Sequence, residues 1–306
     1  MTENPRVSIV VPFFNEEESI PPLVQAVRDA LDPVGITFEL VAVDDGSSDR
    51  THEVLAAEHE KDPRVRVLKL RRNYGQTPAM AAGFDHCRGD VVVTMDGDLQ
   101  NDPADIPMML SKLEEGFEFV CGWRKQRQDR WLSRKLPSRI ANWIIGRITG
   151  VTVHDYGCSL KAYKSSLVKG FHIYSDMHRF LPALARLAGA RIAEVVVRHH
   201  PRRFGVSKYG ISRTVKVVLD LLAVKMILGF SNRPAHWFGG LALPALALSV
   251  GALSWAIQVD SNFIPISILL FFLSFHFFAL GLLGELVILT GDHHVGDLAL
   301  RAEEDA

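Results

Sequence analysis

The chain has 306 residues, enough for about two domains, and its formal charge of −1 at pH 7 provides no overall attraction to nucleic acid. Hydrophobic residues make up 48% of it, and the apolar excess lies after His236. The three cysteines, Cys87, Cys121 and Cys158, are widely spaced and match no zinc or redox pattern, so we expect them in the core of a protein in a reducing compartment. The amino terminus lacks a basic segment followed by an apolar one, and no cleavable signal peptide is expected.

Short aliphatic segments alternate with helical patterns through the first part of the chain. We expect strands at residues 7–11, 38–43, 65–70, 91–94, 119–122 and 192–197, and helices at about 15–31, 49–60, 77–87 and 104–115. Acidic residues 16–18 should lie in the first turn of the first helix, where they complement its dipole. This alternation predicts an open, mostly parallel α/β sheet with helices on both faces.

Polar side chains gather where the first four expected strands end. In chain order they are Asn15 and Glu16, Asp44 and Asp45, Asn73, and Asp96 and Asp98. Ligands of parallel α/β sheets bind beyond the carboxyl ends of the strands, so the pattern favours a nucleotide site. Neither a Gly-x-Gly-x-x-Gly motif nor a Gly-Lys-Ser/Thr phosphate loop occurs. A metal is therefore the expected partner for the phosphates.

Asp96 and Asp98 follow a strand and are separated by a single glycine. The glycine allows a tight turn in which both carboxylates face one hard cation. An ordinary acidic turn is the alternative, and it accounts for Asp102, which should cap a helix that begins at Pro103. For Asp96 and Asp98 the spacing alone leaves both interpretations open.

Two basic amphipathic segments are expected, at residues 132–149 and 211–230. The first combines tryptophan and arginine with apolar residues at helical spacing, which is typical of a helix on an anionic membrane surface; a solvated helix packed on the sheet is the alternative. The second suits an interfacial helix.

The last part of the chain has the composition of membrane-spanning helices. Residues 237–259 carry no charge and residues 263–290 carry only Glu285, and each segment exceeds the roughly 20 residues that span a bilayer. Lys and Arg are frequent before Trp237 and absent from the short turn between the segments, so the α/β domain and both chain ends are expected in the cytoplasm. The expected domains are 1–210 (catalytic), 211–233 (juxtamembrane helix), 234–292 (two transmembrane helices) and 293–306 (tail).

Six short motifs, spread along the chain in order, resemble those of family 2 glycosyltransferases with the GT-A fold. Within that family the resemblance is to polyprenyl-phosphate glycosyltransferases: dolichyl-phosphate mannose synthases, bactoprenol glucosyl transferases and undecaprenyl-phosphate aminoarabinose transferases. The motifs are Pro12-Phe13-Phe14-Asn15-Glu16, Asp44-Asp45-Gly46-Ser47-Ser48-Asp49, Arg72-Asn73-Tyr74-Gly75-Gln76, Asp96-Gly97-Asp98-Leu99-Gln100, Asp155-Tyr156-Gly157-Cys158 and Arg202-Arg203-Phe204-Gly205-Val206-Ser207-Lys208-Tyr209.

The resemblance implies a role for individual residues. Donor binding is implied for Pro12, Asn15, Glu16, Asp44, Asp45, Asn73 and Asp96. Mg²⁺ or Mn²⁺ on the donor diphosphate would be held by Asp96, Asp98 and Gln100. Acceptor phosphate binding is implied for Arg124, Arg127, Arg202, Ser207 and Lys208. The catalytic residues would be Asp155 and Asp98.

The implied reaction is an inverting transfer of a sugar from a nucleotide sugar to polyprenyl (undecaprenyl) phosphate, at the cytoplasmic face of a bacterial inner membrane and in a homotetramer like others in the family. UDP-glucose is the first expectation for the donor. The tail after Glu285 lacks the basic ending of aminoarabinose transferases, which makes an aminoarabinose donor less expected. A phosphate monoester is largely dianionic near neutral pH and hardly needs a base, so we expect Asp155 mainly to orient the reacting groups.

Two other functions remain open from the sequence. A processive polysaccharide synthase would share the fold, but the segment Gln128-Asp129-Arg130-Trp131 is one residue short of the Gln-x-x-Arg-Trp motif of such enzymes. A non-catalytic scaffold that binds nucleotide sugars at the membrane is the second alternative, against which the intact Asp96, Asp98, Asp155 and Arg202 argue.

Overall fold

The computed structural model describes residues 4–125, 146–147, 150–169, 177–204 and 233–290. They fall into two compact units, an α/β unit before residue 221 and a helical unit within residues 222–297. The amphipathic segment expected at 211–230 lies outside the described residues, as does most of the segment at 132–149. The domain boundaries expected at 210 and 292 therefore stay predictions.

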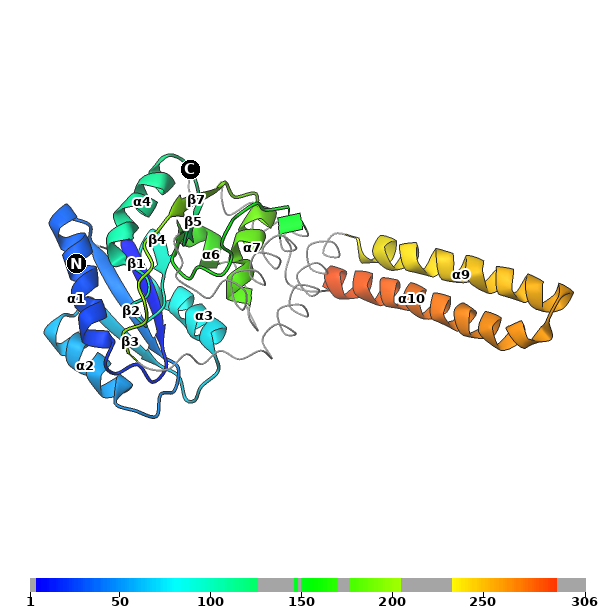
Figure 1. Ribbon diagram of the computed structural model, residues 1–306, viewed down its shortest axis with the longest axis horizontal. Coiled ribbons are helices and arrows are strands. Elements are labelled where there is room, and N and C mark those ends of the chain that lie inside the picture. The colour runs from blue at the N-terminus through cyan, green and yellow to red at the C-terminus, as the bar shows by residue number, and fades with distance from the viewer. Residues whose placement is uncertain (1–3, 126–145, 148–149, 170–176, 205–232, 291–306) are drawn as a thin grey trace. The chain divides into compact units, whose positions relative to one another are not determined.

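A single mostly parallel sheet forms the centre of the α/β unit (Figure 1). Its strand order, among the described residues, is β3-β2-β1-β4-β6-β5-β7. The strands are β1 Val7–Phe13, β2 Phe38–Asp44, β3 Val65–Lys69, β4 Val91–Thr94, β5 Phe119–Trp123, β6 Lys161–Lys164 and β7 Ile192–Val196. β6 runs antiparallel to both β4 and β5, whereas the other pairs are parallel. The predicted fold class is confirmed.

Helices cover both faces of this sheet. They are α1 Ile20–Leu31, α2 Thr51–Lys61, α3 Gln76–His86, α4 Ile106–Glu114, α6 Ser165–Lys169 and α7 Leu181–Leu187. On one face Ile9 of β1 belongs to a core cluster with side chains of α1 and α4. On the other face Val10 lies against Gly83 of α3, where an added Cβ would come within 2.2 Å of the valine side chain. β1 and β2 are mostly apolar and buried, as expected of parallel strands that are covered on both faces.

The first helix begins later than predicted. α1 starts at Ile20, after the N-cap Ser19, and residues 15–18 form a loop in which Asn15 has a φ of 52°. The backbone N–H groups of this loop are bound by side chains that follow β2: Asn15 N donates to Ser47 Oγ at 3.0 Å, and Glu16 N donates to Thr51 Oγ1 at 2.9 Å. These cross-loop hydrogen bonds replace the helical ones, so the expected acidic first turn of α1 was wrong.

Other local predictions are confirmed. Asp102 Oδ1 accepts a hydrogen bond from Ala104 N at 3.0 Å and so caps the 3₁₀ turn Pro103–Asp105 that leads into α4. All three cysteines are free and buried in the α/β unit.

The helical unit is a hairpin of two long helices, α9 Pro234–Gln258 and α10 Ile264–Thr290, joined through the 3₁₀ turn Ser261–Phe263. Ser249 and Ser267 each donate a hydrogen bond to the other's backbone carbonyl, at 2.8 and 2.9 Å. Near the open end, Glu285 of α10 accepts a hydrogen bond from Ala235 N in the first turn of α9 at 3.3 Å. The hairpin therefore satisfies polar groups internally, as an apolar solvent requires.

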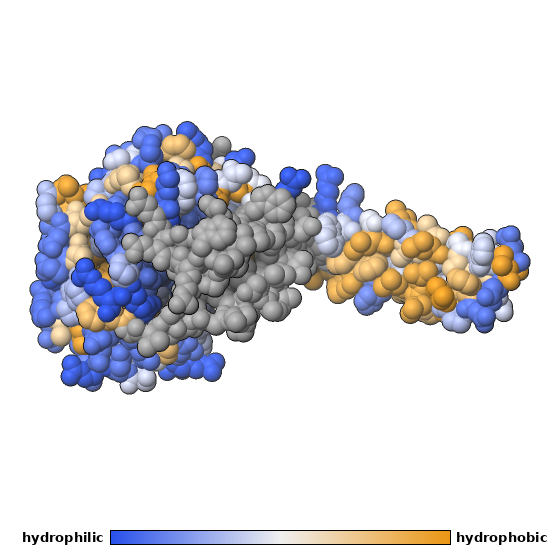
Figure 2. All heavy atoms as spheres, in the orientation of Figure 1, coloured by the Kyte–Doolittle hydropathy of each residue, from blue (hydrophilic) through white to orange (hydrophobic). Residues whose placement is uncertain are grey.

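The surface of this hairpin is apolar, whereas that of the α/β unit is largely hydrophilic (Figure 2). By length and composition both helices could cross a membrane. Only 22% of the most apolar 18-residue stretch of the first helix is buried, and 17% of that of the second. A core helix of a soluble protein would be mostly buried. Exposed apolar surface of this extent marks a membrane or protein interaction surface.

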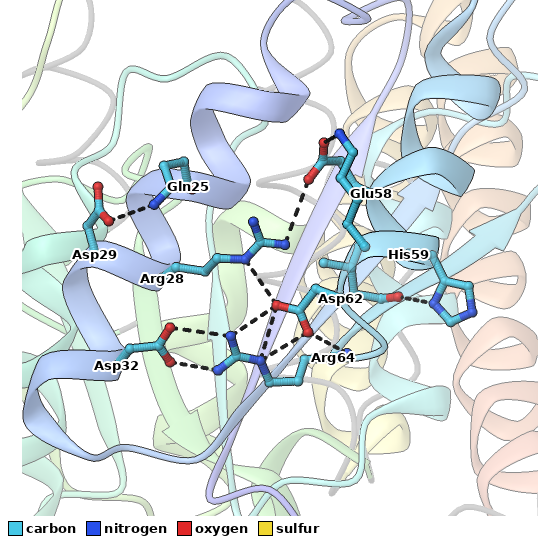
Figure 3. Close-up of polar contacts among 10 residues, drawn as sticks. Gln25, Arg28, Asp29, Asp32, Glu58, His59, Asp62 and Arg64 are labelled. Atoms are coloured by element: carbon cyan, nitrogen blue, oxygen red, sulfur yellow. Dashed lines mark hydrogen bonds and ion pairs between the residues drawn. The ribbon is translucent and has the colours of Figure 1, made fainter.

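An ion-pair cluster joins α1, the end of α2 and the start of β3 (Figure 3). Asp62 accepts hydrogen bonds from the side chains of Arg28, at 3.0 Å, and Arg64, at 3.0–3.2 Å. Arg64 also pairs with Asp32 at 2.6 Å. Burial alone would raise the pKa of Asp62, but the hydrogen bonds from Arg64 and Arg28 lower it to about 2.

We expect this cluster to make folding stability depend on pH. The pKa of Asp62 in the folded state lies below its unfolded value, so its contribution is complete above the unfolded value and is lost as the pH falls from about 5 to about 2. Asp62→Asn should remove on the order of 1–2 kcal/mol of this pH-dependent free energy of unfolding, after allowance for solvent screening. Denaturant unfolding at several pH values measures it. The exposed Asp29→Asn is the control, and equal pH dependence in wild type and Asp62→Asn would contradict the assignment.

Candidate active site

The loops after β1 and β4 lie side by side, because these strands are parallel neighbours at the centre of the sheet. The strand order reverses between them, which is where open α/β sheets form a ligand crevice. Gly97, in the loop after β4, packs against the end of β1 so closely that an added Cβ would lie 2.6 Å from Phe13 Cδ1. Among the described residues other than glycine, only Asn15 and Leu99 have positive φ, and both belong to these two loops. Such backbone strain clusters at functional sites.

Asp44, the last residue of β2, is completely buried. Its Oδ1 accepts a hydrogen bond from Ser47 N at 2.9 Å. Its Oδ2 has no hydrogen-bond partner among the described residues, and the Nδ1 atom of His52 lies 3.9 Å away. A buried acceptor without a partner costs free energy. This oxygen is suited to a hydrogen-bond donor from a ligand.

The neighbouring Asp45 has a different environment from Asp44. Its Oδ1 accepts a hydrogen bond from Tyr74 N at 2.8 Å and its Oδ2 accepts one from Gly75 N at 2.9 Å. Both oxygens thus hold the backbone of the loop after β3, which contains the exposed Asn73. Asn15 holds a loop in the same way, since its Oδ1 accepts from Ser48 N at 2.8 Å. These predicted donor-binding residues shape the rim of the site together with the half-buried Pro12.

Asp98 is a buried carboxylate with a charged partner. Arg202 donates to Asp98 Oδ2 at 2.7 Å and to Glu16 Oε1 at 2.9 Å. Asp98 Oδ1 accepts from Gln100 N at 3.1 Å. Burial raises the pKa of Asp98 to about 6, and the neighbouring charge of Asp96 acts in the same direction. A cation near both carboxylates would relieve this repulsion.

Asp96 has neutral partners. Its Oδ1 accepts a hydrogen bond from Gln76 Nε2 and its Oδ2 accepts one from Ser159 Oγ, both at 2.7 Å. Ser159 was not assigned a function from the sequence, and Gln76 stood in a family motif without a role. The signal available for Gln76 was its position directly after Gly75, at the start of a helix that faces the site.

The oxygen atoms here fit a divalent cation shared with a ligand. Of the residues that the structure describes, no group of three or more His, Cys, Asp and Glu side chains could hold a metal by itself. Asp96 and Asp98 are two carboxylates, and the side chain of Gln100 can add an amide oxygen. Each carboxylate oxygen keeps lone-pair capacity beyond its hydrogen bond. Mg²⁺ and Mn²⁺ accept such a partial set when phosphate oxygens and water complete the coordination.

Asp155 forms a two-pronged ion pair with Arg124 in the interior of the α/β unit. Arg124 Nε lies 2.7 Å from Oδ2 and Nη2 lies 2.9 Å from Oδ1, and the two side chains are only about a tenth exposed. The carboxylate Oε1 of Glu194, on β7, accepts hydrogen bonds from His154 N and Asp155 N and so holds the backbone of this turn. This pairing was not predicted. The other predicted phosphate-binding residues Arg127, Ser207 and Lys208 lie outside the described residues.

The close packing of Gly97 is testable. Gly97→Ala should place a methyl group into Phe13 and displace the Asp96–Asp98 loop, with a destabilisation of about 1–3 kcal/mol. Thermal unfolding of the purified chain measures this. Gly157→Ala is the matched control, since its added methyl meets nothing closer than 3.4 Å. Equal midpoints for the two variants would show that the loop absorbs the methyl group without cost.

Comparison with known proteins agrees with this geometry. Residues 8–171 match the model of Glycosyl transferase family 2, and they include all but the first residue of β1 and all of β2 to β6. A dodecaprenyl-phosphate galacturonate synthase of Rhizobium johnstonii is 50% identical over 251 residues, which cover 80% of this chain and 74% of that protein. An undecaprenyl-phosphate 4-deoxy-4-formamido-L-arabinose transferase of Shewanella sediminis is 41% identical over 290 residues, which cover 92% of this chain and 86% of that protein.

Solved structures share the fold at low sequence identity. The crystal structure of glucosyl-3-phosphoglycerate synthase from Mycobacterium tuberculosis, in complex with Mn²⁺, UDP and phosphoglyceric acid, superimposes with a TM-score of 0.56 at 21% identity. The match covers 72% of this chain and 78% of that one. Sequence and fold agree that this chain belongs to glycosyl transferase family 2 and is a glycosyltransferase of the GT-A fold.

Proposed function

We propose that this glycosyltransferase transfers a sugar from a nucleotide sugar to a polyprenyl phosphate, with inversion at the anomeric carbon. The observation that carries the proposal is the similarity, at 36–50% identity, to relatives whose names specify dodecaprenyl or undecaprenyl phosphate. The apolar hairpin of α9 and α10 supports it, because a lipid-borne acceptor requires an enzyme at the membrane.

For the donor we propose a UDP-uronate, with UDP-galacturonate first. The relative with 50% identity is named for galacturonate, and those with 36–41% identity are named for a formamido sugar. UDP-glucose, the expectation from the sequence motifs, has the weaker support. A uronate differs from glucose and galactose by a carboxylate at C6, so a comparison of matched sugars separates these donors.

In the proposed reaction a phosphate oxygen of the acceptor attacks the anomeric carbon, and the bond from that carbon to the diphosphate breaks. Asp44 Oδ2 would accept a hydrogen bond from the base, and Asp96, Asp98 and Gln100 would hold Mg²⁺ or Mn²⁺ on the diphosphate. The metal would offset charge on the departing nucleoside diphosphate. Arg202, which pairs with Asp98 and Glu16, would bind the phosphate of the acceptor.

Asp155 is proposed to orient groups rather than to remove a proton. An acceptor phosphate with a second pKa near 6 is already largely dianionic at neutral pH. Both oxygens of Asp155 accept hydrogen bonds from Arg124, so the carboxylate is held in a two-pronged ion pair. The pair would instead fix the position of Arg124 near the reacting phosphate.

We also propose that α9 and α10 cross a bacterial inner membrane twice, with the catalytic unit in the cytoplasm. The excess of Lys and Arg before Trp237 supports this orientation. A homotetramer stays an expectation, since the segment expected to support it lies mostly outside the described residues.

A donor panel tests the reaction. The purified chain in detergent would receive undecaprenyl or dodecaprenyl phosphate and, in turn, UDP-galacturonate, UDP-glucuronate, UDP-galactose, UDP-glucose or UDP-4-deoxy-4-formamido-L-arabinose. We expect UDP release and a lipid-linked sugar, detected by mass spectrometry, with UDP-galacturonate as the preferred donor. Transfer from UDP-glucose but not from the uronates would reject the donor assignment. Binding without transfer for every donor would support the scaffold, and a polymer product would support the synthase.

The role of Asp155 has a separate test. Asp155→Asn should reduce turnover about 100-fold, since a misplaced partner costs roughly this factor. The acidic limb of the pH–rate profile should stay where it is in the wild type, because the limb then belongs to the acceptor phosphate. Loss of that limb in Asp155→Asn would show that Asp155 acts as the general base.

A further inference from the structure

The two carboxylates of the Asp96–Asp98 loop have partners of opposite kinds. Asp98 pairs with a guanidinium, that of Arg202. Asp96 accepts one hydrogen bond on each oxygen from two uncharged side chains, Gln76 and Ser159. Neutral donors fix the direction of a carboxylate without cancelling its charge. Asp96 is thus held in place by two uncharged donors.

The donors themselves come from rigid positions. Gln76 is the first residue of α3, directly after Gly75, whose backbone N–H is bound by Asp45. Ser159 lies two residues before β6, and its backbone carbonyl accepts a hydrogen bond from Thr94 Oγ1 of β4 at 2.9 Å. The side chains that orient Asp96 are therefore anchored near the ends of two strands and at the start of a helix.

A third group joins the same network. The Oδ1 atom of the buried Asn101 accepts from Asp96 N at 3.2 Å and lies 2.9 Å from Ser159 Oγ. The hydroxyl of Ser159 has one proton, and a carboxylate is a stronger acceptor than an amide oxygen. The proton is thus directed to Asp96, and Asn101 fixes the backbone from which Asp96 projects.

We propose that Gln76 and Ser159 are positioning residues that aim the Asp96 carboxylate at the divalent cation of the nucleotide donor. Neither side chain touches the reacting atoms. The inference rests on the proposed function, in which Asp96 binds that cation. Partners that orient a metal ligand typically change metal affinity about 10- to 100-fold when they are removed. The same range is expected here for each residue.

The test is Mn²⁺ binding to the full chain in detergent with saturating UDP, measured by electron paramagnetic resonance of free Mn²⁺. Ser159→Ala and Gln76→Met should each weaken Mn²⁺ binding about 10- to 100-fold. Ser159→Thr restores a hydroxyl and should recover most of the affinity. The double variant should fall to the level of Asp96→Asn and no further, because both residues act through one carboxylate.

Matched controls separate positioning from general damage. Ser165→Ala removes another buried serine hydroxyl, beside Cys87, and Gln25→Met removes a glutamine that bonds Asp29 on the surface of α1. Both should bind Mn²⁺ like the wild type. Unchanged Mn²⁺ affinity in Ser159→Ala and Gln76→Met would overturn the inference, as would a thermal midpoint that falls in proportion to the affinity. Absence of UDP-dependent Mn²⁺ binding in the wild type would instead reject the metal role in the proposed function.

Discussion

The parallel pairing of β1 with both β2 and β4 is the constraint on which the rest of the α/β unit depends. It places the ends of three strands, and the loops that follow them, at one edge of the sheet. The chain continues in opposite directions on the two sides of β1, and open α/β sheets form a ligand crevice at such a reversal of the strand order. Gly97 is needed at this point because the loop after β4 approaches Phe13, at the end of β1, closer than a side chain permits.

The acidic side chains at that crevice differ from one another in their hydrogen-bond and ion-pair partners. Asp45 binds backbone N–H groups and holds a loop. Asp44 keeps one buried oxygen without a hydrogen bond among the described residues, and Asp98 is paired with Arg202. Asp96 is oriented by neutral donors. In the proposed function a nucleotide, a cation and an anionic acceptor would make different electrostatic demands, and these carboxylates differ in the same way in their partners.

The hairpin of α9 and α10 has a surface suited to an apolar solvent. Its helices expose apolar side chains and satisfy their polar groups with each other, through Ser249 and Ser267 and through Glu285. In water this surface would be a liability, whereas in lipid it costs nothing. An enzyme with a hydrophilic catalytic unit and such a hairpin is suited to join a soluble donor to a lipid-borne acceptor.

Several features of this protein are determined by its sequence alone. Mostly apolar runs mark β1 and β2, and the long apolar segments mark α9 and α10. Asp102 before Pro103 marks a helix start. Each of these signals depends on neighbours within a few residues. The order of motifs also identified the family. Tertiary structure decided the rest: the late start of α1, the reversed direction of β6, the pair of Asp155 with Arg124, and the hold of Gln76 and Ser159 on Asp96. These depend on residues that are tens of positions apart, and no local pattern records which of them the sheet brings together.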